Sequence, residues 1–259
     1  MLFVLALIHF LFCASRYSTY MNNRDLNSTM EKPLPVPQWH FFNTNKHYTL
    51  VYLLGWLVSV IECTYSLITI TLFLTLMIFV LSQISELHII ARDIDFYSGL
   101  LQKSQLQILF LLVSKHQKII KYVDELNKSM RQILLVEFLL NSINIASVTV
   151  VILVYEMPIV YLLFNINFVA LLVVQLFFLS WHANEIEIQS LLLCESLYVS
   201  EWYNFEPEAN KIINIMMIRS LSPLNIYIGI FYPMTLATAL TTMKTAYSYV
   251  TMIVSFTDN

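Results

Sequence analysis

The sequence is poor in glycine and in charged residues. Only 3 of its 259 residues are glycine and 12% are charged, about half of the charged fraction of an average soluble domain. Hydrophobic residues make up 58% of the chain, and several apolar runs reach the roughly 18 residues that indicate a membrane span. This composition excludes an ordinary soluble domain and predicts a polytopic, all-α membrane protein.

Cysteine and the usual catalytic motifs are also scarce. Cys13, Cys63 and Cys194 are too few and too scattered for a disulfide framework, so we interpret them as small packing residues. The sequence has no HExxH or CxxC motif, no glycine-rich phosphate loop, no Ser-His-Asp set and no histidines at metal-binding spacing. We therefore expect no enzyme, no cofactor, no metal site and no catalytic residues.

Four apolar segments are long enough to cross a bilayer. We predict membrane helices at residues 50–85, 132–155, 159–182 and 223–257, with Pro233 as a kink or as the start of the regular part of the last one. Residues 1–15 are apolar too. They fit either the core of a signal peptide, which a basic residue should precede, or the end of a membrane helix that begins before Met1.

The distribution of Lys and Arg predicts an orientation. Residues 86–131 contain seven of them and residues 183–222 contain two, against four in residues 16–49. The positive-inside bias places the first two segments in the cytoplasm, and residues 16–49 and the C-terminus outside. The sequon at Asn27 is then a glycosylation candidate, whereas the sequon at Asn127 is a false positive. The basic residues are interpreted as a solvated helix face, with no nucleic-acid partner.

Several stretches, taken in order, carry a family resemblance. They are LPVPQWHFFN, HQKIIKYVDELN, NEIEIQSLLLCESLYVSEWY, MMIRSLSP and TMKTAYSYVTMI. Together they resemble the insect odorant receptors, a family of seven-helix ligand-gated cation channels. Ser180 and Ala183 replace a Cys and a Gly that are common there, and the resemblance covers nearly the whole chain.

The resemblance implies a fold and a setting. Residues 1–15 would be the end of the third helix, followed by helices four to seven, with the last one split at Pro223. The chain would then be N-terminally truncated, either as an incomplete sequence or as a non-functional remnant. An intact receptor would form a heterotetramer with a shared odorant co-receptor in the plasma membrane and bind a small volatile ligand.

Other functions remain as alternatives. A gustatory-type receptor channel has the same architecture, but its last helix usually ends in a TYxxxxxQ-like motif, where this chain has Ser255. A secondary transporter or a lipid-modifying enzyme would need inverted repeats or clustered intramembrane acids, and the sequence contains neither.

The resemblance implies a ligand pocket in the outer half of the membrane. Aromatic residues at helical spacing are its candidates: Tyr52, Trp56, Tyr161, Phe164 and Phe168. Aromatic rings suit apolar volatile ligands, although interfacial anchoring and helix packing favour the same residues. Glu62, a carboxylate within a span, should face protein or water, and Glu137 is expected to be cytoplasmic.

The last apolar segment is unusually polar. Thr241, Thr245, Ser248, Met252 and Ser255 recur at spacings of four and three, which places them on one helix face. The resemblance implies that this face lines the pore, with Met252 at the gate, Ser255 at a polar constriction and Lys244 off the stripe. The alternative is that the hydroxyls bond back to their own helix.

The resemblance also implies an anchor through which subunits assemble. It would comprise the extensions of the helices beyond the membrane and the short apolar helix Lys211–Leu221. The candidate residues of this anchor are Tyr198, Trp202, Met216 and Arg219.

Overall fold

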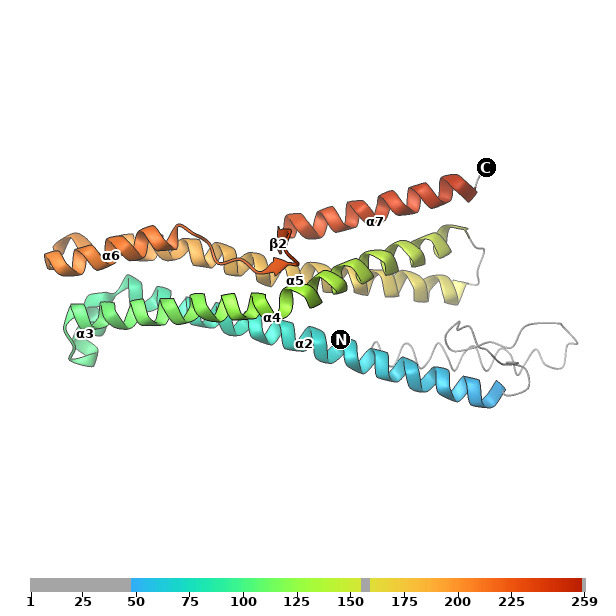
Figure 1. The fold of residues 1–259 in the computed structure, drawn as a ribbon, viewed down its shortest axis with the longest axis horizontal. Coiled ribbons are helices and arrows are strands. Elements are labelled where there is room, and N and C mark those ends of the chain that lie inside the picture. Colours follow the sequence, from blue (N-terminus) through green and yellow to red (C-terminus); the bar gives the residue numbers. More distant parts are fainter. Residues whose placement is uncertain (1–47, 155–158, 258–259) are drawn as a thin grey trace, which may run out of the picture. The chain divides into compact units, whose positions relative to one another are not determined.

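The computed structural model describes residues 48–154 and 159–257 (Figure 1). Residues 1–15 and the glycosylation candidate Asn27 lie outside these ranges. The chain divides into two compact units, residues 1–72 and residues 73–259, and each is considered by itself.

Long helices account for most of the described chain. They are α2 (Tyr48–Arg92), α4 (Gln105–Val154) and α5 (Ile159–Val199), and shorter elements are α3 (Ile94–Leu101), the 3-10 turn η2 (Trp202–Asn204), α6 (Pro207–Ser220) and α7 (Leu236–Thr257). The three long helices contain stretches long and apolar enough to cross a membrane. This confirms the prediction of an all-α membrane fold.

Each long helix is about twice the length that a bilayer requires. α4 has 50 residues and α5 has 41, against roughly 20 for a span. The segments predicted as 86–131 and 183–222 are therefore largely continuous helical extensions of the membrane segments. Within the apolar windows only 11–28% of the residues are buried inside the chain, so most of these faces are left for lipid or for other proteins.

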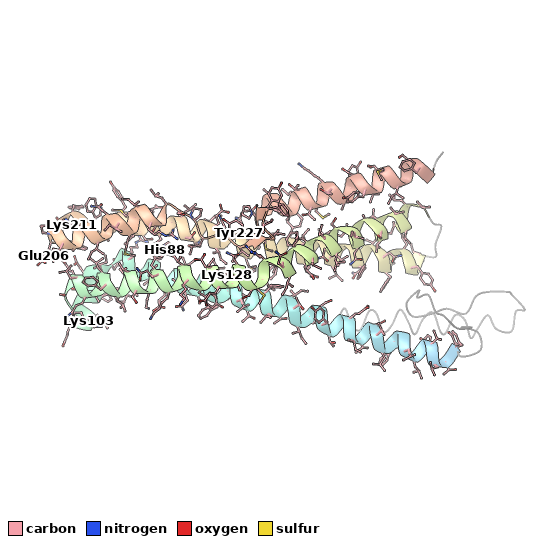
Figure 2. The ribbon with its side chains drawn as sticks, in the orientation of Figure 1. His88, Lys103, Lys128, Glu206, Lys211 and Tyr227 are labelled. Atoms are coloured by element: carbon pink, nitrogen blue, oxygen red, sulfur yellow. The ribbon has the colours of Figure 1, made fainter. Side chains whose placement is uncertain are left out.

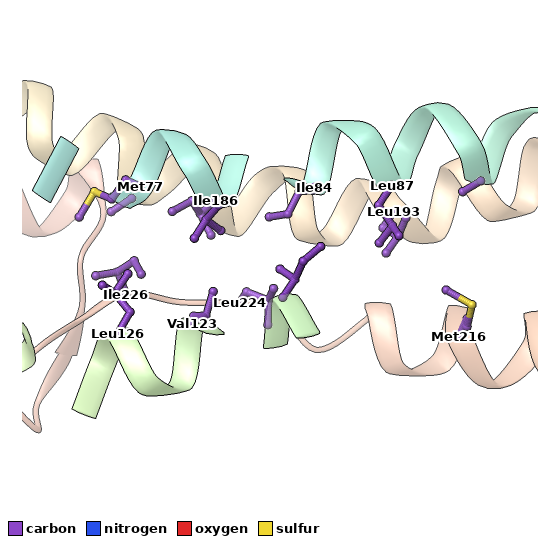
Figure 3. Close-up of a cluster of buried hydrophobic side chains, with 14 of the residues drawn as sticks. Met77, Ile84, Leu87, Val123, Leu126, Ile186, Leu193, Met216, Leu224 and Ile226 are labelled. Carbon is purple, nitrogen blue, oxygen red and sulfur yellow. The ribbon is translucent and has the colours of Figure 1, made fainter. Parts of the chain in front are cut away.

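The main core of the second unit lies where these extensions meet. Side chains of residues 73–92 of α2 pack with α4, α5, α6 and the segment after α6 (Figure 3). The helical period selects these positions, because residues three or four apart share one face. The labelled members are Met77, Ile84, Leu87, Val123, Leu126, Ile186, Leu193, Met216, Leu224 and Ile226.

The last apolar segment is split, as predicted at Pro223. α6 ends at Ser220, and an antiparallel pair of short strands, β1 (Tyr227–Ile228) and β2 (Tyr232–Pro233), precedes α7 (Figure 1). The regular helix α7 begins at Leu236, three residues after Pro233. Pro223 and Pro233 cannot donate backbone hydrogen bonds, and the intervening segment pairs with itself and with α4 instead.

Gly229 is required at the tip of this segment. Its φ is +62°, a conformation that costs other residues free energy. Its amide donates to the carbonyl of Arg131 at 2.8 Å, and a Cβ at this position would meet Leu135 Cδ2 at 3.0 Å. Both the conformation and the close approach to α4 exclude a side chain.

His116 is a buried ionisable group in the α4 extension. Only 7% of its surface is exposed. Burial, together with the positive charge of Arg219 on α6, lowers the pKa of His116 from its ordinary value to about 4. The imidazole is therefore neutral in the folded protein at physiological pH.

We predict that Gly229→Ala destabilises the protein by roughly 1–2 kcal/mol from the positive φ alone, with more from the contact with Leu135. The measurement is the midpoint of thermal unfolding in detergent. Gly99→Ala is the matched control, because Gly99 lies in α3 and a Cβ added there would meet no atom within 4 Å. Alanine at that helical position should not destabilise, so equal losses at both glycines would contradict the interpretation.

We predict that His116 makes stability fall with acidification. In the unfolded chain the pKa of this histidine is about 6.5, so acidification protonates the unfolded state before the folded state. The contribution of His116 to the free energy of unfolding is therefore fully present above pH ~6.5 and is lost as the pH falls toward 4. His116→Leu should flatten this part of the curve of unfolding midpoint against pH. Curves of identical slope for the two proteins would show that His116 does not carry the effect.

Candidate functional site

One face of α7 packs against its own chain. Ala246 and Val250 are buried against Ile145 and Ala146 of α4, together with half-buried residues of α5. Further along the same face, Ala239 is fully buried and Met243 joins the cluster. The alanines have small side chains, which lets the backbones of α7 and α4 come close.

The opposite face of α7 carries the polar stripe predicted from the sequence. Thr241, Thr245, Ser248, Met252 and Ser255 are all exposed. With about 100° between successive residues, Met252 points half a turn away from Val250. Met252 is 55% exposed, whereas Val250 is 5% exposed. The stripe therefore faces away from α4 and α5.

The hydroxyls of the stripe donate to their own helix. Thr245 Oγ1 donates to the Thr241 carbonyl at 2.9 Å, Ser248 Oγ to that of Lys244 at 3.0 Å, and Ser255 Oγ to that of Met252 at 2.7 Å. Each hydroxyl oxygen retains acceptor lone pairs. The hydrogen bonds are those that the alternative interpretation expected, in which the hydroxyls bond back to their own helix.

The aromatic candidates lie on two helices. Tyr161, Phe164 and Phe168 are half-buried on one face of α5. In the first unit, Tyr52 is half-buried beside Tyr48, with ring centroids 5.9 Å apart. Trp56 follows one turn later and is 38% exposed.

Glu62 lies on α2 in the first unit and is exposed. Its neighbours Ile61 and Tyr65 are 57% and 68% exposed. A carboxylate within an apolar stretch needs water or a polar partner, and this position leaves the side chain open to one from another subunit.

A polar tie between α4 and α5 was missed by the sequence interpretation of Glu137. Its Oε1 accepts hydrogen bonds from Gln175 Nε2 at 3.1 Å and from the buried Asn141 at 3.4 Å. Three polar residues on facing helices satisfy one another here, so that none is left without a partner in an apolar surround. Gln175 is a single polar residue within an apolar run, and this was the sequence feature from which the hydrogen bond to Glu137 could have been predicted.

The anchor candidates have different environments. Tyr198 is 67% exposed, while Trp202 and Arg219 are half-buried. Arg219 donates to the Ser222 carbonyl at 3.1 Å. Met216 is only 3% exposed, which corrects its assignment to a contact surface, because the helical period turns it inward with Ala209, Ile213 and Ser220.

The outer face of α6 is apolar instead. Ile215 is 67% exposed, Ile218 is 69% exposed, and Leu221, just after the helix, is 65% exposed. These three residues follow one another at intervals of three and share a face.

Asn127 is a further polar residue that the sequence interpretation set aside. Its side-chain amide bonds to the backbone of Asn225 and of Tyr227 (Figure 2 shows Tyr227 beside the part of α4 that carries Lys128). Elsewhere within residues 48–154 and 159–257, no group of three His, Cys, Asp or Glu side chains could hold a metal ion.

Solved structures share this fold. The structure of the insect olfactory receptor OR5 from Machilis hrabei in complex with eugenol matches 98% of this chain and 65% of that chain, with a TM-score of 0.78 and 15% identity. A second solved structure of the same receptor matches this chain with a TM-score of 0.74 and 16% identity.

Sequence relatives agree with the structural match. Odorant receptor 10 of Aedes albopictus is 29% identical over 142 residues, which cover 55% of this chain and 38% of the relative. Odorant receptor Or2 of Anopheles gambiae is 28% identical over 138 residues, covering 53% and 36%. The matched regions thus span well under half of these curated relatives.

The family model described as 7tm Odorant receptor matches residues 1–247. Because that match covers almost the whole chain, this multi-pass membrane protein belongs to the odorant receptor family.

Proposed function

We propose that this chain is an odorant-receptor subunit of a ligand-gated, non-selective cation channel, with α7 lining the pore. The observation that carries the proposal is the two-faced character of α7. Its small apolar residues pack against α4 and α5, and its hydroxyl stripe is exposed. An exposed polar stripe is unfavourable in lipid, so the stripe is proposed to face a water-filled path between subunits.

The chemistry of the stripe suits cations. Thr245 and Ser248 donate their hydroxyl protons to their own helix, and a hydroxyl oxygen can also accept, so these exposed oxygens can replace part of the hydration shell of a cation. The stripe carries no acidic residue that would hold a cation tightly or select for its charge. Met252 supplies an apolar ring where the path can narrow and close by dewetting.

The apolar surface of α6 supports assembly. Ile215, Ile218 and Leu221 are exposed, and a cluster of this kind outside the lipid is best covered by another subunit. Tyr198, which is exposed, and Trp202 are the other proposed contacts. We propose a heterotetramer with a shared co-receptor in the plasma membrane, with this region in the cytoplasm and the C-terminus outside, as the charge bias indicates.

The aromatic residues are the proposed ligand contacts. Tyr161, Phe164 and Phe168 on α5 are proposed to contact a small volatile molecule through shape and apolar area. Tyr52 and Trp56 on α2, which belong to the first unit, are proposed separately as ligand contacts. Glu62 lies on α2, the helix that also carries Tyr52 and Trp56, and is the polar functional residue that we propose there. A ligand opens the channel to the extent that it binds the open state more tightly than the closed one.

We predict that the full-length protein containing this chain produces odorant-evoked cation currents when co-expressed with a co-receptor subunit. The measurement is whole-cell current across a broad panel of volatile compounds, with the co-receptor alone as the control. Surface expression without any evoked current above that control would contradict the channel function.

We predict that Met252→Ala raises the resting current or changes the relative permeability to cations, because a smaller side chain weakens an apolar constriction. Tyr247→Ala is the matched control. Tyr247 is 70% exposed on α7 but lies off the polar stripe. Unchanged resting current and permeability in Met252→Ala, or the same change in both variants, would remove Met252 from the gate.

A further inference from the structure

The segment that joins α6 to α7, residues 221–235, is called here the linker. Four of its hydrophobic side chains, Leu224, Ile226, Ile228 and Met234, are buried in the main core of the second unit, whereas Leu221, Ile230 and Phe231 are exposed. The linker is therefore a packed structural element, although it contains no helix. Any displacement of the N-terminal end of α7 must disturb this packing.

Asn127 of α4 holds the linker by two hydrogen bonds. Its Nδ2 donates to the carbonyl of Asn225 at 2.8 Å, and its Oδ1 accepts from the amide of Tyr227 at 2.9 Å. The side-chain amide thus pairs with the linker as a neighbouring strand would. We propose that Asn127 is a positioning residue that fixes the N-terminal end of the pore helix α7, and this proposal rests on the channel function proposed above.

The pairing requires asparagine. One side chain must donate to a carbonyl and accept from an amide two residues further along. A carboxylate can accept but cannot donate, and glutamine carries the same amide on a longer stem. Alanine can make neither bond, and serine has only a single oxygen at which both bonds would have to meet.

From Asn127 the hydrogen bonds continue to α7. β1 pairs with β2, where Tyr227 is opposite Pro233, and the amide of Met234 donates to the Ile226 carbonyl at 2.7 Å. The Pro233 carbonyl in turn accepts from Thr238 Oγ1 in the first turn of α7 at 2.8 Å.

The start of α7 is itself capped. Thr235 Oγ1 accepts from the Thr238 amide at 3.3 Å, as an N-cap residue does. Asn127 and the first turn of α7 are thus joined by a short series of bonds, all of them within the second unit.

Two further hydrogen bonds hold the linker, one on each side of the residues that Asn127 contacts. Before β1, the amide of Leu224 donates to Ser190 Oγ of α5 at 2.9 Å. After β1, the amide of Gly229 donates to the Arg131 carbonyl, one turn along α4 from Asn127. Between them, Asn127 makes one bond to Asn225, just before β1, and one to Tyr227 in β1.

This arrangement conflicts with use of the Asn127 sequon. A glycan would be attached to Nδ2, the atom that donates to Asn225. Glycosylation and the pairing with the linker therefore exclude each other. Ser129→Ala offers a clean separation, because it removes the sequon and leaves the amide of Asn127 in place.

The pairing confines the gating motion. With its N-terminal end held, α7 can move mainly at the end that carries Met252 and Ser255. Loss of the two bonds lowers the cost of moving α7 without a ligand. We expect Asn127→Ala to raise the ratio of resting current to maximal odorant-evoked current by about tenfold.

The first experiment measures this ratio in the full-length protein, co-expressed with the co-receptor and normalised to surface expression. Asn127→Asp should show a smaller rise, because it keeps only the acceptor. Ser129→Ala should behave as the unmodified protein. A merely structural role would lower surface expression and both currents together and leave the ratio unchanged, which would overturn the proposal, as would a rise in Ser129→Ala as large as that in Asn127→Ala.

A second experiment does not depend on channel activity. Hydrogen exchange of the purified protein in detergent should show the amides of residues 225–229 protected, and Asn127→Ala should increase their exchange about tenfold or more. If no currents are found but this difference is, the channel function fails and the pairing stands. If the variant exchanges as the unmodified protein does, the pairing itself is refuted whatever the currents show.

Discussion

The fold depends on burial of apolar side chains where the helices extend beyond their most apolar parts. Inside a bilayer, lipid is as apolar as a leucine side chain, so the hydrophobic effect provides little reason for helices to associate. The structure reflects this difference. The cluster between α7 and the apolar parts of α4 and α5 contains four buried residues, whereas the main cluster, which combines the extensions with parts of the adjoining apolar segments, runs from Phe73 to Ala239. The extensions hold the second unit together, and the apolar segments remain largely open.

That openness explains the two unlike faces of α7. A helix bound along its whole circumference could not also border a channel. α7 is attached along one narrow face of small residues and at its N-terminal end through the linker. The hydroxyl stripe is therefore not covered by α4 or α5. Polar residues elsewhere are handled in the opposite way: Glu137 and Gln175 meet between α4 and α5, so that an otherwise unfavourable carboxylate joins two helices.

Periodicity in the sequence predicted much of the fold and one face of the candidate site. Long apolar runs with almost no glycine or proline could only form helices in lipid, because every backbone group there needs an internal partner. The stripe from Thr241 to Ser255 is a property of one helix and could be read from spacing alone. The inward position of Met216 was not foreseen, since α6 is apolar nearly all round and only its neighbours determine which side is buried. The paired strands between Pro223 and Leu236 were not foreseen, because the segment that holds them in place lies on α4, about a hundred residues earlier in the chain.

The sequence by itself determined where the apolar helical segments lie, the break after α6 and the polar stripe of α7, because these follow from local patterns of a single segment. Only the tertiary structure decided which face of each helix is buried, why Gly229 must lack a side chain and what Asn127 does. These depend on which atoms meet across large separations in the chain. Asn127 looked like an unused glycosylation motif while its partners were unknown, and its two hydrogen bonds became evident once the linker lay beside it.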